Sequence, residues 1–329
     1  MRLVMTLLVR DEADIVDAQI AFHLGAGVDF VIATDNASCD GTTEILESYA
    51  RDGNLHLIRE DGENMQQGAW VTRMARLAAT DFGADWVVNS DGDEFWCSHG
   101  APLKTVLAEV PSRFATVRAL MRNFVPRPGE AEFFAERMNV RLVPGEATEE
   151  RHRVHPFHAQ DKVLHRAHPD VTVSEGNHDA RWASSVDLRG SWSFEILHFP
   201  MRSAEQCIKK WRNYERHGYS GYDVLTDVDA REYYESLVVD DAALAPGLAS
   251  GVFVVDNRLR DALRRIRGES GTVAAPDGSG PLYLPSLTTR EAAALAADAA
   301  AGSERDAFVK AERRLRELET RLTALERRA

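Results

Sequence analysis

The chain has 329 residues and a formal net charge of −13 at pH 7. Hydrophobic residues make up 44% of it and charged residues 28%, which is the composition of a globular protein. The acidic balance argues against a nucleic-acid-binding surface, which would be basic, and it gives no electrostatic attraction to anionic lipid. The length allows one large α/β domain with additions or two small domains. Three cysteines without a C-x-x-C pair indicate reduced thiols.

The chain begins with a short apolar run over residues 1–9, followed at once by the charged residues Arg10, Asp11 and Glu12. We interpret this run as a buried first strand and not as a signal peptide, because no small-residue cleavage site follows it. No stretch of the sequence approaches the ~20 apolar residues that a membrane-spanning helix needs. We therefore expect a cytoplasmic protein with no integral membrane segment.

Strand and helix patterns alternate over residues 2–88. Acidic residues occupy the first turn of the first expected helix, and Gly25 and Gly27 close it, as the rules for helix ends require. Such alternation predicts an α/β fold in which a mostly parallel sheet lies between helices. We predict strands over residues 2–9, 28–34, 55–58 and 86–88, and helices over residues 11–23, 40–49 and 70–77.

The pattern becomes strand-rich and irregular over residues 116–199. Strands are predicted over residues 116–121, 138–143, 162–165 and 194–198, and a helix over residues 202–216. The following part of the chain reads as a helical extension. We expect one domain over residues 1–225, a helical continuation packed on it over 226–266, a Gly-, Pro- and Ser-rich linker over 267–288, and a helical tail over 289–329.

The tail carries apolar residues in an a/d alternation for roughly three heptads. This pattern predicts a short coiled coil that would join copies of the chain into a homo-oligomer. The alternative is an amphipathic helix that folds back on its own domain, since three heptads are marginal for an isolated coil. The alternating residues are Phe308, Ala311, Leu315, Leu318, Leu322 and Leu325.

The residues with the clearest chemistry are Asp91 and Asp93, which follow the expected strand at 86–88 with only Gly92 between them. Open α/β sheets bind ligands at the carboxyl ends of their strands. Two carboxylates on one tight turn suit Mg²⁺ or Mn²⁺ bound together with a phosphate. A solvated acidic turn is the alternative. An EF-hand loop is set aside because Phe95-Trp96-Cys97 breaks its ligand pattern, and an aspartyl-phosphate site because no Thr or Val soon follows the first Asp.

A second polar segment, from Asp35 to Thr42, follows the expected strand at 28–34. Asp35 can accept a hydrogen bond from the N–H of a uracil ring or from a ribose hydroxyl, and Asn36 and Ser38 can add further hydrogen bonds. The alternative is a turn followed by a helix N-cap, because these residue types favour turns.

Three segments together resemble glycosyltransferase family 2, whose fold is GT-A. They are Arg10-Asp11-Glu12-Ala13, the segment from Asp35 to Thr42 with Asn36 and Ala37 replacing the family's second Asp and its Gly, and Asp91-Gly92-Asp93-Glu94-Phe95. Looser likeness continues through Lys162-Val163-Leu164, Gly176-Asn177-His178 and Leu197-His198-Phe199-Pro200-Met201-Arg202-Ser203, which look like the branch with an L-H-F…R-S ending.

The resemblance implies transfer of a sugar from a nucleoside diphosphate (UDP, GDP or dTDP) to the hydroxyl of a glycan or small-molecule acceptor, with Mn²⁺ or Mg²⁺ as the cofactor. A divalent cation neutralises the charge that develops on the leaving phosphate. The resemblance makes Asp93 a direct metal ligand. Asp91 either joins it or holds the ribose and a metal-bound water. The later His198 is a third ligand, and the alternative for it is a half-buried histidine that caps a strand.

Nucleotide contacts are expected from Arg10, Glu12 and Arg73, in addition to Asp35, Asn36, Ser38 and Asp91. Arg73, Lys209 and Lys210 could contact the diphosphate. For each of them the alternative is a solvated basic face of a helix. An inverting enzyme also needs a carboxylate that takes the proton of the acceptor hydroxyl. The sequence offers Asp179, Glu175 and Glu195 for this role without singling one out.

Two other functions use a similar fold. A nucleotidyltransferase of sugar phosphates would carry a Gly-rich basic loop after the first strand, and here that loop is acidic and lacks glycine. A non-catalytic scaffold would be expected to have lost Asp91 or Asp93, and both are present. We therefore favour the glycosyltransferase, in glycan or polysaccharide biosynthesis.

Six of the eleven histidines lie within residues 152–178, including His152, His155 and His158. One interpretation is a second metal site, although zinc sites of this kind want flanking Cys or carboxylate ligands on a rigid element. The stretch is loop-like, so we prefer a mobile loop over the acceptor site.

Overall fold

The computed structural model of the chain describes residues 1–62, 66–129, 133–143, 157, 160–188, 194–216 and 226–268. The chain divides into two units, Met1–Ser286 and Leu287–Ala329, and every described residue belongs to the first. The Ala-rich helix, the coiled-coil tail, most of the linker, and His152, His155 and His158 lie outside the described residues. Among the described residues, no helix has the length and apolar character needed to cross a membrane.

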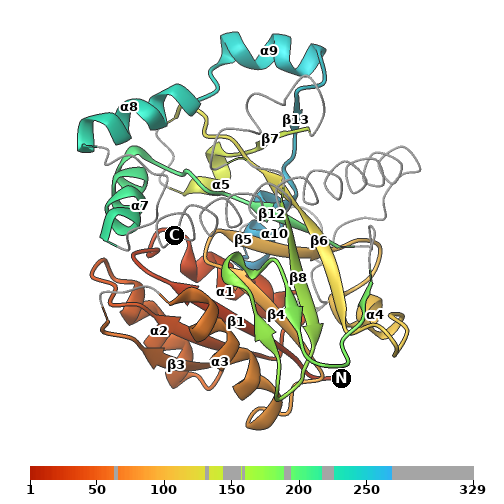
Figure 1. Cartoon of the computed structure of the whole chain (residues 1–329). Coiled ribbons are helices and arrows are strands. Elements are labelled where there is room, and N and C mark those ends of the chain that lie inside the picture. Colours follow the sequence, from red (N-terminus) through yellow and green to blue (C-terminus); the bar gives the residue numbers. More distant parts are fainter. Residues whose placement is uncertain are drawn as a thin grey trace, which may run out of the picture. The chain divides into compact units, whose positions relative to one another are not determined.

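The first part of the chain forms the expected alternation of strands and helices (Figure 1). The elements are β1 (Leu3–Val9), α1 (Val16–Gly25), β2 (Phe30–Asp35), α2 (Thr42–Arg51), β3 (Leu55–Arg59), α3 (Gln67–Thr80) and β4 (Trp86–Asp91). Strands β1, β2, β3 and β4 are parallel, in the order β3-β2-β1-β4.

Strand β1 lies in the middle of these four strands, and every one of its residues is buried. Successive side chains of a strand point to opposite faces of the sheet. Leu3, Met5 and Leu7 accordingly join the hydrophobic cluster that contains residues of α1, α2 and α10, whereas Val4 and Leu8 join the cluster of α3. Helices therefore cover both faces, which explains why the strand is apolar almost throughout.

The rest of the chain adds strands to the same sheet and then helices. The elements are β5 (Glu94–Ser98), α4 (Leu103–Ala108), β6 (Thr116–Asn123), α5 (Phe134–Arg137), β7 (Val140–Leu142), β8 (Asp161–Arg166), β9 (Thr172–Val173), η2 (Glu175–Asn177), β10 (Ala180–Arg181), β11 (Asp187–Leu188), β12 (Phe194–His198), α7 (Ala204–Arg216), α8 (Asp227–Leu237), α9 (Asp241–Ala249), β13 (Phe253–Val255) and α10 (Arg258–Ile266). Within the described residues the main sheet has nine strands, in the order β3-β2-β1-β4-β8-β6-β12-β5, with β11 paired to β6.

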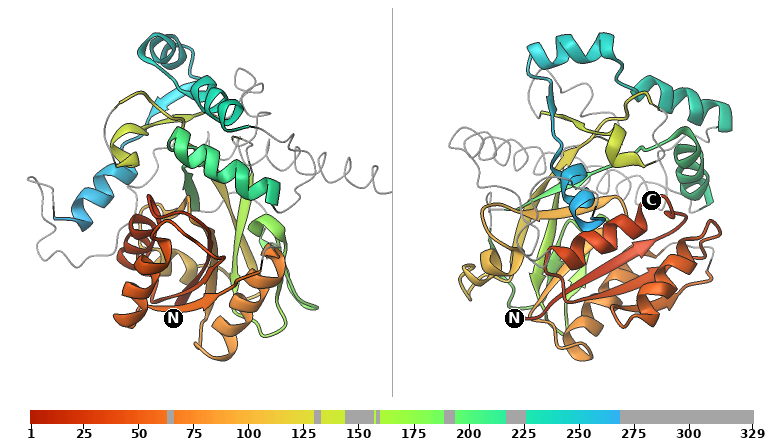
Figure 2. Two further views of the ribbon diagram at one scale, coloured as in Figure 1. Left: turned by 90° about the vertical axis from the view of Figure 1, so that its left-hand side faces the viewer. Right: turned by 180° about the vertical axis from the view of Figure 1, so that it is seen from behind.

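Most strands of this sheet run in one direction. β8 is antiparallel to β4 and β6, and β5 is antiparallel to β12, whereas β6 and β12 are parallel to each other. The predicted fold class, an α/β fold with a mostly parallel sheet flanked by helices, is thus confirmed. Helix α10 returns to the beginning of the chain and packs beside α1 (Figure 2, right).

The connection from β4 to β5 forces the sheet to curl. β5 is four strand positions away from β4 in the sheet, which would be about 19 Å in a flat sheet. Only Gly92 and Asp93 separate the two strands, and a link of this length spans at most about 11 Å. The far edge of the sheet, which is β5, must therefore bend back toward β4. The acidic turn lies where these two strands come together.

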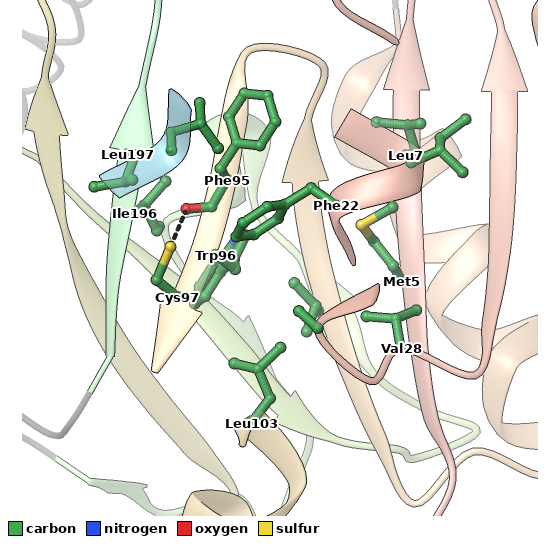
Figure 3. Packing of buried hydrophobic residues seen from close by; sticks show 14 of the residues in the cluster. Met5, Leu7, Phe22, Val28, Phe95, Trp96, Cys97, Leu103, Ile196 and Leu197 are labelled. Atoms are coloured by element: carbon green, nitrogen blue, oxygen red, sulfur yellow. Dashed lines mark hydrogen bonds between the residues drawn. The ribbon is translucent and has the colours of Figure 1, made fainter. Parts of the chain in front are cut away.

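Side chains of β5 pack in one hydrophobic cluster with Phe22 of α1 and with Ile196 and Leu197 of β12 (Figure 3). The ring of Phe95 lies edge-on to the ring of Phe22 from α1, with centroids 5.5 Å apart. Trp96 is fully buried in the same cluster, together with Ile196 of β12. The packing of β5 against α1 and β12 holds the turn before it in place.

Several predicted boundaries are corrected by the structure. The helix expected over residues 11–23 begins only at Val16, because Asp11 has a positive φ of 53° and Glu12 binds a distant arginine. The strand expected over 138–143 is the short β7, which pairs with β13 outside the main sheet. Strand β5 was missed altogether.

Helix α1 contains a buried histidine that links it to β5. Nδ1 of His23 donates to the carbonyl oxygen of Gln19 at 2.7 Å, and Nε2 accepts from the backbone N–H of Trp96 at 3.0 Å. Both ring nitrogens are therefore satisfied in the neutral form. Burial lowers the pKa of His23 from 6.5 to about 4.

We expect His23 to make the protein less stable as the pH falls from 6.5 toward 4. In this window the unfolded chain binds a proton at His23 and the folded protein does not, so protonation favours unfolding. The loss through this residue between pH 6.5 and pH 5 is expected to be about 2 kcal/mol. Urea unfolding at both pH values measures it. Between these pH values His23→Leu should lose about 2 kcal/mol less of its free energy of unfolding than the wild type. The exposed-site control His56→Leu should behave like the wild type. Equal losses in all three proteins would contradict the assignment.

Candidate active site

Polar side chains from many elements meet at one edge of the sheet because of the strand directions. The carboxyl ends of the parallel strands lie at this edge, as do the amino ends of the antiparallel β8 and β5. The residues at these ends are Arg10 after β1, Asp35 in β2, Asp91 in β4, Asp93 before β5, Asn123 in β6, Lys162 in β8 and His198 in β12.

Asp93 is buried and faces two nitrogen groups. Its Oδ2 accepts a hydrogen bond from Nζ of Lys210 at 2.8 Å and lies 3.7 Å from Nε2 of His198. The backbone carbonyl of Asp93 accepts from the N–H of Phe199 at 2.9 Å, which fixes the residue against the end of β12. Burial acts to raise the pKa of Asp93, but the neighbouring charge of Lys210 opposes it most strongly, and this pKa is held well below its usual value. Asp93 is therefore a carboxylate at neutral pH.

The orientation of His198 is set by Asn123. The side-chain amide of Asn123 donates to the carbonyl oxygen of Phe157 at 2.9 Å, so its oxygen is the atom that faces Nδ1 of His198, at 2.7 Å. Nδ1 therefore carries the hydrogen. Burial lowers the pKa of His198, which favours the neutral ring. The lone pair of Nε2 then faces the carboxylate of Asp93.

Both carboxylate oxygens of Asp91 accept hydrogen bonds from neighbouring side chains. Oδ2 accepts from Nζ of Lys162 at 2.6 Å. Oδ1 accepts from the side-chain amides of Asn177 at 3.0 Å and Gln67 at 3.3 Å. Because Gln67 also accepts from the backbone N–H of Gly176 at 3.1 Å, Asp91 ties η2 and the start of α3 to the end of β4.

Lys162 is also shared with Glu94, the residue after the acidic turn. Its Nζ lies 2.7 Å from Oε1 of Glu94, and Oε2 of Glu94 accepts from the backbone N–H of Asp91 at 3.1 Å. Burial acts to lower the pKa of Lys162, but Asp91 and Glu94 outweigh it and raise this pKa. Burial raises the pKa of Glu94 to about 8, against the opposing effect of Lys162. Lys162 thus keeps its charge between two acidic side chains, of which Glu94 is the more deeply buried.

Arg202 connects the segment after β12 to the loop after β1. Its side chain is 1% exposed. It donates to Asp14 from Nε at 2.6 Å and from Nη2 at 2.9 Å, and Nη2 also binds Glu12. Burial acts against the charge of Arg202, but Glu12 and Asp14 outweigh it and raise its pKa. This buried pairing explains why residues 11–15 form a loop and not the first turn of a helix.

The loops after β1 and β2 bind each other through backbone amides and side-chain oxygens. The N–H of Asp11 donates to Oγ of Ser38 at 3.0 Å, and the N–H of Cys39 donates to Oδ1 of Asp11 at 2.8 Å. Oδ1 of Asp35 accepts from the N–H of Ser38 at 3.1 Å. Nη1 of Arg10 donates to Oδ1 of Asn36 at 3.3 Å. The predicted nucleotide residues Arg10, Asp35, Asn36 and Ser38 thus form one cluster.

The remaining predicted residues lie in different surroundings. Arg73 forms an ion pair with Glu60 at 2.5 Å and is 42% exposed. Glu175 is exposed on η2, two residues before Asn177. Asp179 faces Arg118 at 3.6 Å and Arg181 at 2.5 Å.

Glu195 does not join the cluster at the strand ends. Its neighbour in the strand, Ile196, has the same orientation as His198, so Glu195 points to the opposite face of the sheet. Its carboxylate is buried among Arg122 at 3.0 Å, His99 at 3.4 Å and the guanidinium of Arg258 from α10. It anchors α10 to the sheet.

The donor atoms at Asp93 and His198 suit a divalent cation. A carboxylate oxygen and an imidazole nitrogen are ligands that Mn²⁺ accepts, and the hydrogen bond from Nδ1 to Asn123 is the kind of support that orients a metal-binding histidine. The described residues contain no group of three or more His, Cys, Asp or Glu side chains that could hold a metal ion. Two protein ligands leave the other positions for oxygen atoms of a substrate.

The sequence did not point to several of these contacts. Lys162 lies 71 residues from Asp91 and was noted only as part of a loose likeness, and Glu94, Asn123 and Gln67 were given no role. The charge of Lys162 at the start of a buried strand was the available signal, because a buried lysine needs a carboxylate partner. Lys210 was assigned more readily to a solvated helix face, yet it reaches Asp93.

Comparison with known proteins gives similarity at the level of structure only. Neither a protein-family model nor a curated protein matches the sequence. Similar solved structures include S. aureus TarS (residues 1–349) in complex with UDP-GlcNAc, at 11% identity and a TM-score of 0.37, covering 71% of this chain and 72% of that chain. They also include glucosyl-3-phosphoglycerate synthase from Mycobacterium tuberculosis with Mn²⁺, UDP and glucosyl-3-phosphoglycerate, at 18% identity and a TM-score of 0.27, covering 37% and 44%. Values this low carry no argument about activity, which rests on the geometry described above.

The buried group of Lys162, Asp91 and Glu94 predicts unequal effects of two substitutions. Lys162→Met should lower the free energy of unfolding by about 3–5 kcal/mol, because it leaves a buried carboxylate without its cation. Glu94→Gln should cost only about 1–2 kcal/mol, because burial raises the pKa of Glu94 and the substitution replaces one acceptor by a donor of similar shape. Denaturant unfolding at pH 7 measures both. A cost for Glu94→Gln equal to that of Lys162→Met would show that Glu94 is ionised.

Proposed function

We propose that the protein is a metal-dependent glycosyltransferase of the GT-A type, which transfers a sugar from a nucleoside diphosphate to an acceptor hydroxyl with inversion. The observation that carries the proposal is the pairing of Asp93 with the oriented Nε2 of His198 at the edge where the parallel strands end. The ammonium group of Lys210 lies at the same carboxylate oxygen, and a divalent cation held by Asp93 and His198 would take its place. This edge is also where sheets of this class bind their ligands.

In this proposal Asp93 and His198 hold Mn²⁺ or Mg²⁺. When bound, the cation neutralises negative charge on the leaving diphosphate. Asp93 contributes a full negative charge because its pKa is held low. Asn123 keeps the ring of His198 in the tautomer that offers a lone pair to the site.

Asp91 has a different role from Asp93 in this proposal. Its oxygens accept from Lys162, Asn177 and Gln67, so it positions η2 and α3 beside the turn and is not a ligand. Within the D-x-D pattern, Asp91 thus positions its neighbours and Asp93 binds the metal. In this proposal the nucleotide lies against the loops that carry Arg10, Glu12, Asp35, Asn36 and Ser38, which are the contacts that the sequence led us to expect.

Among the three predicted bases we favour Glu175. Glu195 is enclosed by three cationic or imidazole groups, and Asp179 is paired with two arginines. Glu175 is exposed and lies two residues from Asn177, which binds Asp91. A carboxylate that is open to an acceptor can take the proton of the acceptor hydroxyl.

We expect Asp93→Ala to abolish metal-dependent nucleotide binding without unfolding the protein. Calorimetric titration of the wild type with UDP, GDP and dTDP, each with and without Mn²⁺, should give metal-dependent binding of one nucleotide. Asp93→Ala removes the charged member of the two proposed ligands and should reduce that affinity by about 100-fold or more. The exposed-site control Asp52→Ala should bind like the wild type.

Other outcomes of this titration would contradict the proposal. Tight binding of a triphosphate with no preference for a diphosphate would indicate a nucleotidyltransferase. Binding to none of the nucleotides would indicate a scaffold. Unchanged binding by Asp93→Ala would show that the metal lies elsewhere.

Glu175→Gln should lower the turnover number for sugar transfer by about 100-fold or more, the usual contribution of a general base. Its affinity for the metal–nucleotide pair should not change, because the side chain acts on the acceptor. The matched variant Asp179→Asn should retain most of the turnover. If Asp179→Asn instead loses more turnover than Glu175→Gln, the assignment of the base is reversed.

A further inference from the structure

Lys210 lies where a metal ion at Asp93 would need room. It projects from α7, and its ammonium nitrogen is 2.8 Å from Oδ2 of Asp93 and 3.3 Å from the carbonyl oxygen of Pro200. Oδ2 is also the carboxylate oxygen that faces His198. The ammonium group of Lys210 and the ring of His198 therefore face the same oxygen atom, Oδ2 of Asp93.

An ammonium group and a divalent cation cannot share this position. Two cations a few ångströms apart in a partly buried site repel each other strongly. A metal held by Asp93 and His198 together would use Oδ2, the oxygen that faces His198, and this is the oxygen that Lys210 contacts. Binding of the metal therefore requires Lys210 to move.

We propose that Lys210 is a positioning residue that competes with the divalent cation for Asp93 and, once displaced, binds the diphosphate of the donor. This inference rests on the proposed function. In the protein without ligands the ammonium group neutralises Asp93 and keeps metal affinity low. When the metal arrives with a nucleoside diphosphate, the phosphate oxygens offer Lys210 a new anionic partner, so the metal and the nucleotide bind cooperatively.

The two other lysines near the turn do not fit this role. Lys162 is only 5% exposed and is fixed between Asp91 and Glu94. Lys209 is 47% exposed and faces Asp40 at 3.3 Å. Lys210 is 18% exposed, and its flexible four-carbon stem allows the ammonium group to exchange one partner for another.

The position of α7 also allows the ammonium group of Lys210 to exchange Asp93 for another partner. The helix begins directly after Arg202, whose guanidinium is held by Asp14 and Glu12. Its first turn is therefore anchored at the site, and Lys210 is two turns further along. Only the side chain needs to move for the ammonium group to leave Asp93.

The test measures Mn²⁺ affinity directly, from the electron paramagnetic resonance signal of free Mn²⁺, with and without the nucleoside diphosphate that the wild type binds. Lys210→Met should bind Mn²⁺ about tenfold more tightly than the wild type in the absence of nucleotide, because the competing charge is gone. It should bind the nucleotide about tenfold more weakly in the presence of Mn²⁺. Lys209→Met, which removes the neighbouring charge, should match the wild type in both measurements.

Unchanged or weaker Mn²⁺ affinity of Lys210→Met without nucleotide would overturn this inference. Lys210→Gln repeats the measurement with a polar side chain, so that loss of folding in one variant does not decide the result. If the wild type binds Mn²⁺ together with a nucleotide and the variants show no gain, only the role of Lys210 fails. If the wild type binds neither together, the proposed function itself fails.

Discussion

The connection of two residues between β4 and β5 is the constraint on which the site depends. Because Gly92 and Asp93 cannot span the width of a flat sheet, β5 and its partner β12 must approach the end of β4. His198, at the end of β12, is brought to Asp93 by this curl. Gly92 is itself closely packed, since a Cβ at this position would lie 3.2 Å from the side chain of Val9. The turn is thus fixed by the topology of the sheet and by its contact with the loop after β1.

The acidic side chains around the turn lie beside basic ones. Asp91 and Glu94 share Lys162, and Glu12 and Asp14 share Arg202. Lys162 and Arg202 are themselves buried, and losing their carboxylate partners would leave an uncompensated charge, so they act as fixed parts of the scaffold. Asp93 differs, because its cation is the side chain of Lys210 on α7. The site therefore contains one carboxylate whose cation can be exchanged.

The sequence predicted the fold better than the site. Alternation of apolar strands with helices was sufficient for β1, β2, β3 and β4, because their hydrophobic periods are strong and local. Strand β5 was missed because Phe95-Trp96-Cys97 follows the acidic turn directly and has no alternation to mark it as a strand. The late start of α1 was missed for a similar reason, since the loop from Asp11 is held by Arg202, which lies 188 residues from Asp14. Long-range ion pairs of this kind leave no local pattern. The contacts behind the proposed division of roles between Asp91 and Asp93 were likewise hidden, because Lys162 and Asn177 lie far from Asp91 in the sequence. The predicted nucleotide contacts, the oligomeric tail and the choice of base stay predictions.

The most direct test of the account is to locate the metal. A crystal of the protein with Mn²⁺ and the nucleoside diphosphate that it binds, measured at a wavelength where manganese scatters anomalously, would show the ion's position. The account predicts one anomalous peak within coordination distance of the Asp93 carboxylate and of Nε2 of His198, with Asp91 still bound to Lys162. A peak at Asp91 with Lys162 displaced, or a bound nucleotide with no peak at Asp93, would contradict it.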